Sequence, residues 1–232
     1  MKNEIILVIS DLHAPYQHRD SLKFLEAIKK KYKPTAVWNV GDEVDYHAIS
    51  YHDSDPDLPS AGDELKKAKK FIKKLESLFP EMILVDSNHG SLVYRKAKTN
   101  GIPKSVFKSY KDILGVKSWE WKNYHKHKLC NGQEVFMIHG FKKNGLALCK
   151  EMGMSTIQGH YHSEFSIGYT SNPNNLNWSL MVGCLIDDKS LAFSYNKVIP
   201  TRPIIGCGII INGQPQLIPM VLDKNGRWDN IC

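Results

Sequence analysis

Apolar runs and helical stripes alternate over the first third of the chain. The run Ile5–Ile9 is continuous and β-branched, which is typical of a strand buried on both faces. The runs 36–40 and 82–85 have the same character. Between the runs, residues 21–31 and 63–79 carry apolar positions three and four apart, which predicts amphipathic helices. The order strand, helix, strand, helix, strand predicts βαβ units and a parallel sheet.

The pattern changes in the second half of the chain. Two more helices are expected at 91–100 and 103–114, and strands at 119–129 and 134–138 flank the hairpin signal Asn131-Gly132. The remaining expected elements are one helix, three short strands and a second hairpin that turns at Asn212-Gly213: 146–152, 156–158, 165–169, 179–184, 204–211 and 216–222. We therefore expect a single α/β domain over the whole chain, with two packed mixed β-sheets flanked by helices.

Five polar clusters each follow an expected strand. They read Asp11-x-His13, Gly41-Asp42-x-x-Asp45, Asn88-His89, His139-Gly140 and Gly159-His160-x-His162. Each pattern alone is common and would most simply be a turn or a surface loop. Together they are more telling, because open parallel sheets place ligand sites at the carboxyl ends of their strands. Imidazole, carboxylate and amide groups bind divalent metals, and a buried cluster of them needs a cation to offset its polarity.

In this order, across residues 11–162, the clusters resemble the pattern of the calcineurin-like metallophosphoesterase superfamily: D-x-H, G-D-x-x-D, G-N-H-[DE], H and G-H-x-H. The resemblance implies that superfamily's four-layer αββα sandwich and a centre of two divalent metals. The implied ligands are Asp11, His13 and His162 for the first metal, Asn88, His139 and His160 for the second, and Asp42 as the bridge. The implied catalytic pair is His89, as the acid, and Asp45, which orients it.

The implied reaction is hydrolysis of a phosphoester by a hydroxide that bridges the two metals, without a phospho-enzyme. Manganese is the expected metal, with iron, zinc, nickel and magnesium as alternatives. The segments 55–62 and 87–103 also look similar to small stand-alone members of the superfamily that bacteriophages carry.

The sequence departs from the superfamily pattern in its third cluster. Ser87 stands where the pattern has glycine, and Gly90 stands where it has an acid. The ligand types survive, so we expect activity to survive. Tyr46 and His47 follow Asp45, where the Ser/Thr protein phosphatase branch has Arg-Gly, which argues against that branch.

Charge narrows the substrate class. Lysine and arginine number 31 against 24 acidic residues, a net charge of +7, which favours polyanionic partners. The leading hypothesis is therefore a phosphodiesterase or nuclease that acts on DNA, RNA or a nucleotide. A phosphatase that acts on a small phosphomonoester is the alternative, and a non-catalytic scaffold that keeps the fold is a third hypothesis, disfavoured because every ligand position is filled.

Several residues outside the clusters have two readings. Arg95 and His47, with His52, are candidate substrate contacts, although a solvated Arg95 is the simpler reading. His125 and His127 alternate on one strand, as a second metal site or an exposed edge would. Trp119 and Trp121 share a strand face that either stacks a base or packs in the core.

Cysteines and hydropathy bear on location. The five cysteines are odd in number and widely spaced, so we expect reduced thiols in a cytoplasmic protein, within the host cytoplasm if the chain is viral. The longest apolar run near the N-terminus has five residues, which is too short for a signal peptide or a membrane span. The sequence makes no prediction of oligomeric state.

Overall fold

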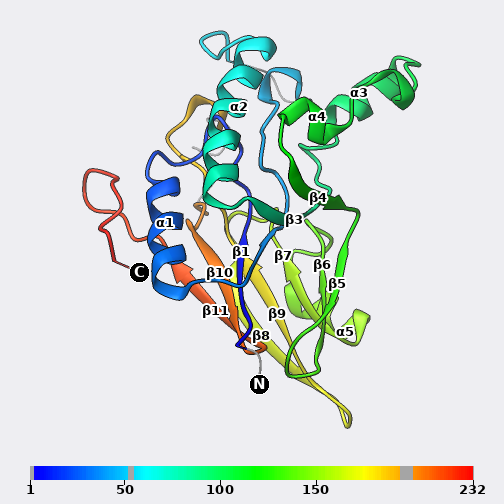
Figure 1. Ribbon diagram of the computed structural model, residues 1–232, viewed down its shortest axis with the longest axis vertical. Coiled ribbons are helices and arrows are strands. Elements are labelled where there is room, and N and C mark those ends of the chain that lie inside the picture. The colour runs from blue at the N-terminus through cyan, green and yellow to red at the C-terminus, as the bar shows by residue number, and fades with distance from the viewer. Residues whose placement is uncertain (1–2, 52–54, 194–200, 232) are drawn as a thin grey trace.

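The computed structural model describes residues 3–51, 55–193 and 201–231 (Figure 1). Two β-sheets pack face to face and have helices on their outer faces, which confirms the expected fold class. The first sheet has the strand order β11-β10-β1-β2-β3-β4 and the second has the order β5-β6-β7-β9-β8. Each sheet is mixed, since both contain parallel and antiparallel neighbours.

The first sheet is built on the βαβ units that the hydrophobic pattern predicts. Its strands are β1 (Ile5–Ile9), β2 (Ala36–Asn39), β3 (Glu81–Val85), β4 (Ser118–Lys122), β10 (Gly206–Ile211) and β11 (Gln214–Pro219). Strands β1 to β4 run parallel, while β10 and β11 form the predicted C-terminal hairpin. Asn212 and Gly213 turn this hairpin with φ of 50° and 85°, as a type I′ turn requires.

The second sheet is built from the later strands. They are β5 (His125–Lys128), β6 (Glu134–Met137), β7 (Ser155–Gln158), β8 (Phe165–Ser171) and β9 (Leu176–Val182). The helix α5 (Gly145–Met152) crosses from β6 to β7 and packs on the outer face of this sheet. It begins at Asn144, whose side chain accepts from the Ala147 amide, and it ends at Gly153 in the left-handed region.

Alternation along β1 fixes the two cores. Leu7 and Ile9 pack with α1 (Ser21–Tyr32) and α2 (Ala61–Leu78) on the outer face of the first sheet, whereas Ile6 and Val8 face the second sheet. All four side chains are buried. Because a strand alternates its side chains, one apolar run serves both the helix–sheet core and the sheet–sheet core.

Two sequence predictions were wrong in detail. The helix expected at 103–114 is two short pieces, η2 (Lys104–Val106) and α4 (Tyr110–Leu114), because Ser109 caps a new helix start by accepting from the Asp112 amide. The strand expected at 119–129 is divided between β4 and β5, which lie in different sheets. Trp119 packs in the helix–sheet core and His125 lies against Trp38 between the sheets, so the chain crosses over between them.

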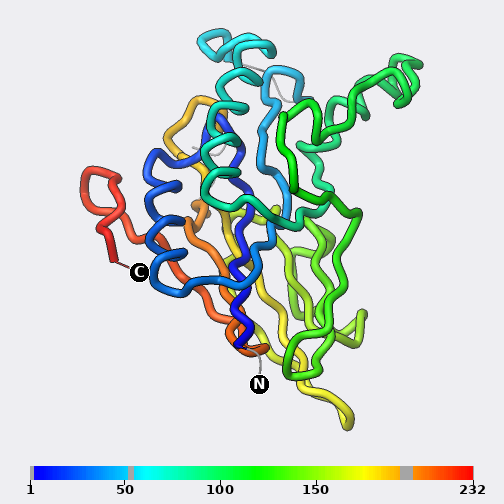
Figure 2. Tube along the Cα trace, viewed as in Figure 1, coloured from blue at the N-terminus to red at the C-terminus, as the bar shows by residue number. Residues whose placement is uncertain are grey.

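The remaining elements lie around the upper end of the first sheet. The short η1 (His47–Ile49) follows β2, and α3 (Leu92–Thr99) projects with α4 from the body of the molecule (Figure 1). Figure 2 shows the C-terminal segment lying beside α1, where Arg227 pairs with Asp20 and the Trp228 ring packs on Phe24. None of the helices in the described ranges has the length and apolarity needed to cross a bilayer.

Candidate metal centre

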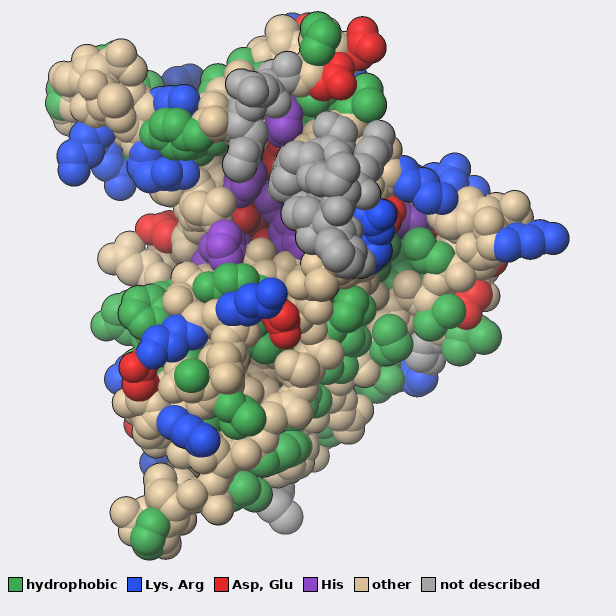
Figure 3. All heavy atoms as spheres, turned by 180° about the vertical axis from the view of Figure 1, so that it is seen from behind, with side chains coloured by type: hydrophobic (Ala, Val, Ile, Leu, Met, Phe, Trp, Pro, Cys, Tyr) green, Lys and Arg blue, Asp and Glu red, His purple; other side chains and the backbone are tan. Residues whose placement is uncertain are grey.

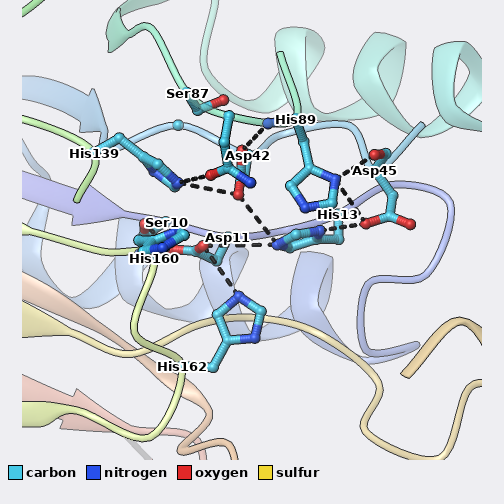
Figure 4. A network of polar contacts seen from close by, with 12 residues as sticks. Ser10, Asp11, His13, Asp42, Asp45, Ser87, His89, His139, His160 and His162 are labelled. Carbon is cyan, nitrogen blue, oxygen red and sulfur yellow. Dashed lines mark hydrogen bonds and ion pairs between the residues drawn. The ribbon is translucent and has the colours of Figure 1, made fainter. Parts of the chain in front are cut away.

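The five polar clusters converge at one end of the two sheets, although they are spread over 152 residues of sequence (Figure 4). Three clusters leave the carboxyl ends of β1, β2 and β3 in the first sheet, and two leave β6 and β7 in the second. The parallel strands of both sheets point at the same edge, which brings the clusters together. The geometry therefore places every predicted ligand in one pocket.

The first group of ligand types joins Asp11, His13 and His162. Their ligand atoms all lie within 4.8 Å of one another. Asp11 Oδ1 lies 3.2 Å from His162 Nε2 and 3.6 Å from His13 Nε2. This is the set that the resemblance implies for the first metal.

The second group joins Asp42, His139 and His160, whose ligand atoms also lie within 4.8 Å of one another. The amide oxygen of Asn88 lies 2.8 Å from His139 Nε2, so it belongs to the same side of the pocket. Asp42 stands between the two groups: its Oδ2 is 3.1 Å from His139 Nε2 and 3.5 Å from His13 Nε2. One carboxylate oxygen thus reaches both groups, as a bridging ligand must.

Hydrogen bonds behind the imidazoles orient them for metal binding. His139 Nδ1 lies 2.8 Å from the Val40 carbonyl oxygen, and His13 Nδ1 lies 2.5 Å from Asp45 Oδ1. Because a carbonyl or carboxylate oxygen only accepts, each Nδ1 carries the proton. Nε2 of each ring then faces the pocket and is the atom that a metal would take, in place of its proton.

One buried atom tests whether a cation fits. His13 Nε2 is buried and has no hydrogen-bond partner within the described residues. It points between the carboxylates of Asp11 and Asp42 at 3.6 and 3.5 Å, beyond hydrogen-bonding distance. A buried imidazole nitrogen facing two carboxylates without bonding either fits a shared divalent cation. The mixed nitrogen and oxygen donors suit manganese, iron, zinc or nickel.

The charges in the pocket also favour a bound cation. Burial alone would raise the pKa of the Asp11 carboxyl, but His13 and His162 outweigh burial and hold that pKa well below its usual range. Burial likewise opposes a low pKa for Asp42, and His139 and His89 overcome it. Burial would lower the pKa of His139, and the Asp42 carboxylate raises it to about 9. The carboxylates are therefore held ionised and demand positive charge.

Backbone strain marks the same residues. Asp11, His13, Asp42 and His160 have φ between 49° and 65°, in the left-handed region that residues other than glycine seldom adopt. Each costs free energy that the surrounding fold must outweigh, and such outliers gather at functional sites. The left-handed backbone at these positions directs the side chains of separate turns into a single pocket.

His89 and Asp45 lie together beside the two groups described above, and His89 forms a third group of possible ligand types with His13 and Asp42. His89 Nδ1 contacts the Asp45 backbone carbonyl and lies 3.3 Å from Asp45 Oδ1. The same carboxylate bonds His13 more closely and approaches His47 Nδ1 at 3.6 Å. Asp45 therefore contacts three imidazoles, where the resemblance implies one. The Nδ1 contacts leave the second nitrogen of the His89 ring directed into the pocket (Figure 4).

The departures in the third cluster leave its loop intact. Ser87 Oγ accepts from the Gly90 amide at 3.1 Å and closes the turn internally. The His89 amide donates to Asp42 Oδ1 at 3.0 Å, which ties this loop to the bridging carboxylate. Gly41, at φ 105°, is required here because a Cβ would come within 2.7 Å of Ser87 Cβ.

The other candidate residues have defined places. Arg95 is exposed, and its Nη2 donates to the Asn88 carbonyl oxygen at 2.6 Å, so it braces the loop of a predicted ligand. His47 is buried rather than exposed to substrate. His52 lies outside the described residues. His127 Nε2 lies 3.2 Å from Glu4 Oε1, and neither His125 nor His127 belongs to a group of three metal-ligand types within the described part of the chain.

Two polar residues near the candidate site were not among the residues predicted from the sequence. Ser10 Oγ contacts Asp11 Oδ2, and it precedes the first cluster without belonging to the pattern. Glu64, buried in α2, accepts from the amides of His47 and Ala48 at 2.7 and 2.9 Å and so fixes η1. Its place on the buried face of an otherwise amphipathic helix is the one signal that was available.

Comparison with known proteins gives the class of protein. Residues 5–177 match the family model of the calcineurin-like phosphoesterases, and the chain belongs to that family. Among solved structures it is similar to vacuolar protein sorting 29 from Cryptosporidium parvum, with 12% identity over 94% of this chain and 96% of that chain and a TM-score of 0.48. It is also similar to Vps29 from Chaetomium thermophilum, with 11% identity over 97% and 94% and a TM-score of 0.49. No curated protein sequence matches the chain.

Proposed function

We propose that this protein is a divalent-metal-dependent phosphoester hydrolase, and specifically a phosphodiesterase that acts on nucleic acid or a nucleotide. The observation that carries the proposal is the position of Asp42, whose Oδ2 lies within 3.5 Å of imidazole nitrogens from both ligand groups. A buried carboxylate shared by two sets of nitrogen and oxygen donors is the arrangement that a two-metal centre needs.

Each residue has a role in this proposal. Two bound cations would neutralise the phosphate charge and supply a water of lowered pKa as the nucleophile. Asp11, His13 and His162 would hold one cation, and Asn88, His139 and His160 the other, with Asp42 common to both. Arg95 would keep Asn88 in place through its backbone carbonyl.

His89 would serve the leaving group. Its Nδ1 is fixed against the Asp45 carbonyl, so a proton on the other ring nitrogen is directed into the pocket. As the imidazolium, His89 would donate that proton to the departing oxygen. The side chain retains access to solvent, with 22% of it exposed, so it can exchange protons between turnovers.

Surface charge supports a polyanionic substrate. Figure 3 shows histidines at the bottom of a hollow, with a group of lysine and arginine side chains on the projecting arm beside it. That arm carries Arg95, Lys96 and Lys98 on α3. Together with the net charge of +7, these cations would attract a phosphate chain to the hollow.

The test compares a diester with a monoester. After treatment with EDTA and addition of Mn²⁺, the protein should hydrolyse bis-para-nitrophenyl phosphate much faster than para-nitrophenyl phosphate, and should cleave DNA or RNA. The His139→Ala variant is the control against contaminating activity. The opposite preference would replace the phosphodiesterase proposal with a phosphomonoesterase, the alternative that uses the same residues.

A further inference from the structure

A cavity of about 800 Å³ lies behind the loop that carries Asn88 and His89. The ends of β3 and β4 form one side of it, and α3, η2 and α4 form the other. Ser87, Gly90 and Ser91 line it, so its wall is the same loop that holds the metal-site residues. Its volume lies within the range of about 300–1,000 Å³ that is typical of small-molecule sites.

Aromatic rings line this cavity. Tyr94, Tyr110 and Trp121 all face it, and none of the three is fully buried. The rings of Tyr110 and Trp121 meet edge to face, with centroids 5.4 Å apart. Exposed faces of such rings stack on planar heterocycles of any kind, because every nucleic acid base has a π-face. The cavity therefore favours a flat aromatic ligand.

A carboxyl group lies at its inner end. Glu43 lines the cavity and is 1% exposed. Its Oε1 accepts from Trp121 Nε1 at 3.3 Å. Its Oε2 is buried near the Tyr110 hydroxyl and completes no hydrogen bond of normal geometry within the described residues. The Tyr110 hydroxyl is a donor beside Oε2, as the Trp121 indole is for Oε1, so Glu43 fixes two of the aromatic rings that line the cavity.

Positive and negative side chains lie on opposite sides of the cavity. The helical side contributes four cations: Arg95, Lys98, Lys104 and Lys111. The strand side contributes Asp86 and Glu120. Lys104 Nζ lies over the Tyr94 ring, 5.0 Å from its centre, so an aromatic ring holds this cation on the helical side. An anionic group attached to a flat ligand would therefore lie toward the helices.

Arg95 connects this cavity with the metal centre. It lines the cavity, and its guanidinium donates to the Asn88 carbonyl oxygen at 2.6 Å. A phosphate at the Arg95 end of the rim would be next to the loop of a predicted metal ligand.

We propose that this cavity binds the base of a nucleotide, with the attached phosphate against the cations of α3, η2 and α4. The nucleotide is either free or part of a nucleic acid strand. Its assignment as part of the substrate rests on the phosphodiesterase function proposed above, whereas its binding does not.

The test is a binding measurement without metal. The full chain is treated with EDTA and titrated calorimetrically with AMP and with a short single-stranded oligonucleotide. Ribose 5-phosphate and inorganic phosphate are the matched probes that lack a base. We expect saturable binding of AMP, of the oligonucleotide or of both, about tenfold or more tighter than ribose 5-phosphate, because stacking of one base is worth about 1–3 kcal/mol. The two probes identify the source of the nucleotide.

Two variants locate the binding. Trp121→Leu removes a stacking face, and Lys104→Ala removes an exposed cation without touching the core. Both should weaken nucleotide binding about tenfold, while Lys126→Ala on the exposed face of β5 should not change it. Circular dichroism shows whether Trp121→Leu is folded, and Lys104→Ala decides the matter if it is not.

Two results would overturn the inference: no saturable nucleotide binding, or binding that Lys104→Ala leaves unchanged. The two proposals fail separately. A protein that hydrolyses the diester but binds no nucleotide lacks the base site, and one that binds nucleotide but hydrolyses no phosphoester lacks the proposed activity.

Discussion

The two sheets bring different chemistry to the candidate metal centre. The first sheet supplies every carboxylate and amide among the predicted ligands, from Asp11, Asp42 and Asn88, whereas the second sheet supplies imidazoles alone. Each of the two predicted ligand groups contains residues from both sheets. The first sheet therefore sets the negative charge of the centre, and the second completes each coordination set. Metal binding should consequently depend on the packing of one sheet against the other.

The largest effect on activity is expected when the carboxylate shared by both ligand groups is neutralised. Asp42→Asn keeps the shape and removes the charge, and we expect kcat/KM for the diester to fall roughly 10³-fold, since metal-assisted charge stabilisation is worth several kcal/mol. Steady-state kinetics with Mn²⁺ measure the change. Glu134→Gln, an exposed carboxylate on β6, is the matched control. A loss of only a few-fold in Asp42→Asn would show that Asp42 is not shared by two metals.

Substitution of His89 tests whether it donates a proton or binds metal. Because its assigned role is to protonate the leaving group, His89→Ala should lower turnover of an alkyl ester about 10²–10⁴-fold. An activated aryl ester, whose leaving group needs no proton, should lose less, and the metal content should not change. If turnover of the alkyl ester is unaffected, the role assigned to His89 is wrong.

The hydrogen bonds that orient the imidazoles also differ between the two sheets. His13 of the first sheet is oriented by the Asp45 side chain, but His139 of the second is oriented by the Val40 backbone carbonyl, which no side-chain substitution removes. Asp45→Asn should therefore weaken the metal held by His13 about 10–100-fold and spare the other. Calorimetric titration with Mn²⁺ would show two affinities moving apart. Equal weakening of both would contradict the assignment.

The smallest effect is expected at an ion pair outside the predicted ligand groups. Arg227 donates twice to Asp20, at 2.6 and 2.5 Å, and holds the pKa of that carboxyl well below its usual range. A lowered folded-state pKa stabilises the protein above the ordinary carboxyl pKa of about 4, and this contribution is lost as the pH falls through the folded-state value. Arg227→Ala should lower Tm by a few degrees at pH 7, with a difference that shrinks at acid pH.

Thermal unfolding of the wild type and Arg227→Ala over a pH series measures this effect. The Mn²⁺ affinity should be the same in both proteins, because neither Arg227 nor Asp20 is a predicted ligand or contacts one through this pair. A Tm difference that grows as the pH falls would contradict the assigned ion pair.

The fold of the N-terminal half was readable from its hydrophobic pattern. The Ile5–Ile9 run is β1 to the residue, and the helices expected at 21–31 and 63–79 differ from α1 and α2 by one or two residues at their ends. The hydrophobic pattern did not predict the correct elements between residues 103 and 129, where the apolar residues follow neither a helical nor a strand spacing. There Ser109 restarts a helix, and the chain moves from one sheet to the other between Lys122 and His125.

For the candidate site, the sequence predicted which residues converge but not how they are held. Asp42 could be placed near His13 because the carboxyl ends of β1 and β2 share one edge of the first sheet. Its place near His139, which follows β6 in the second sheet, was implied by the resemblance to the metallophosphoesterase pattern. The left-handed backbone at Asp11 and His160 could not be predicted, since no glycine marks it. The cavity that Glu43 lines depends on tertiary contacts that leave no local pattern.

Metal content tests the central claim most directly. After reconstitution with Mn²⁺ and exhaustive dialysis, elemental analysis should find two ions in each wild-type chain. In His139→Ala, which retains the Asp11, His13 and His162 group, it should find one. Wild-type protein that retains no metal, or a His139→Ala variant that retains as much as the wild type, would contradict a two-metal centre built between the sheets.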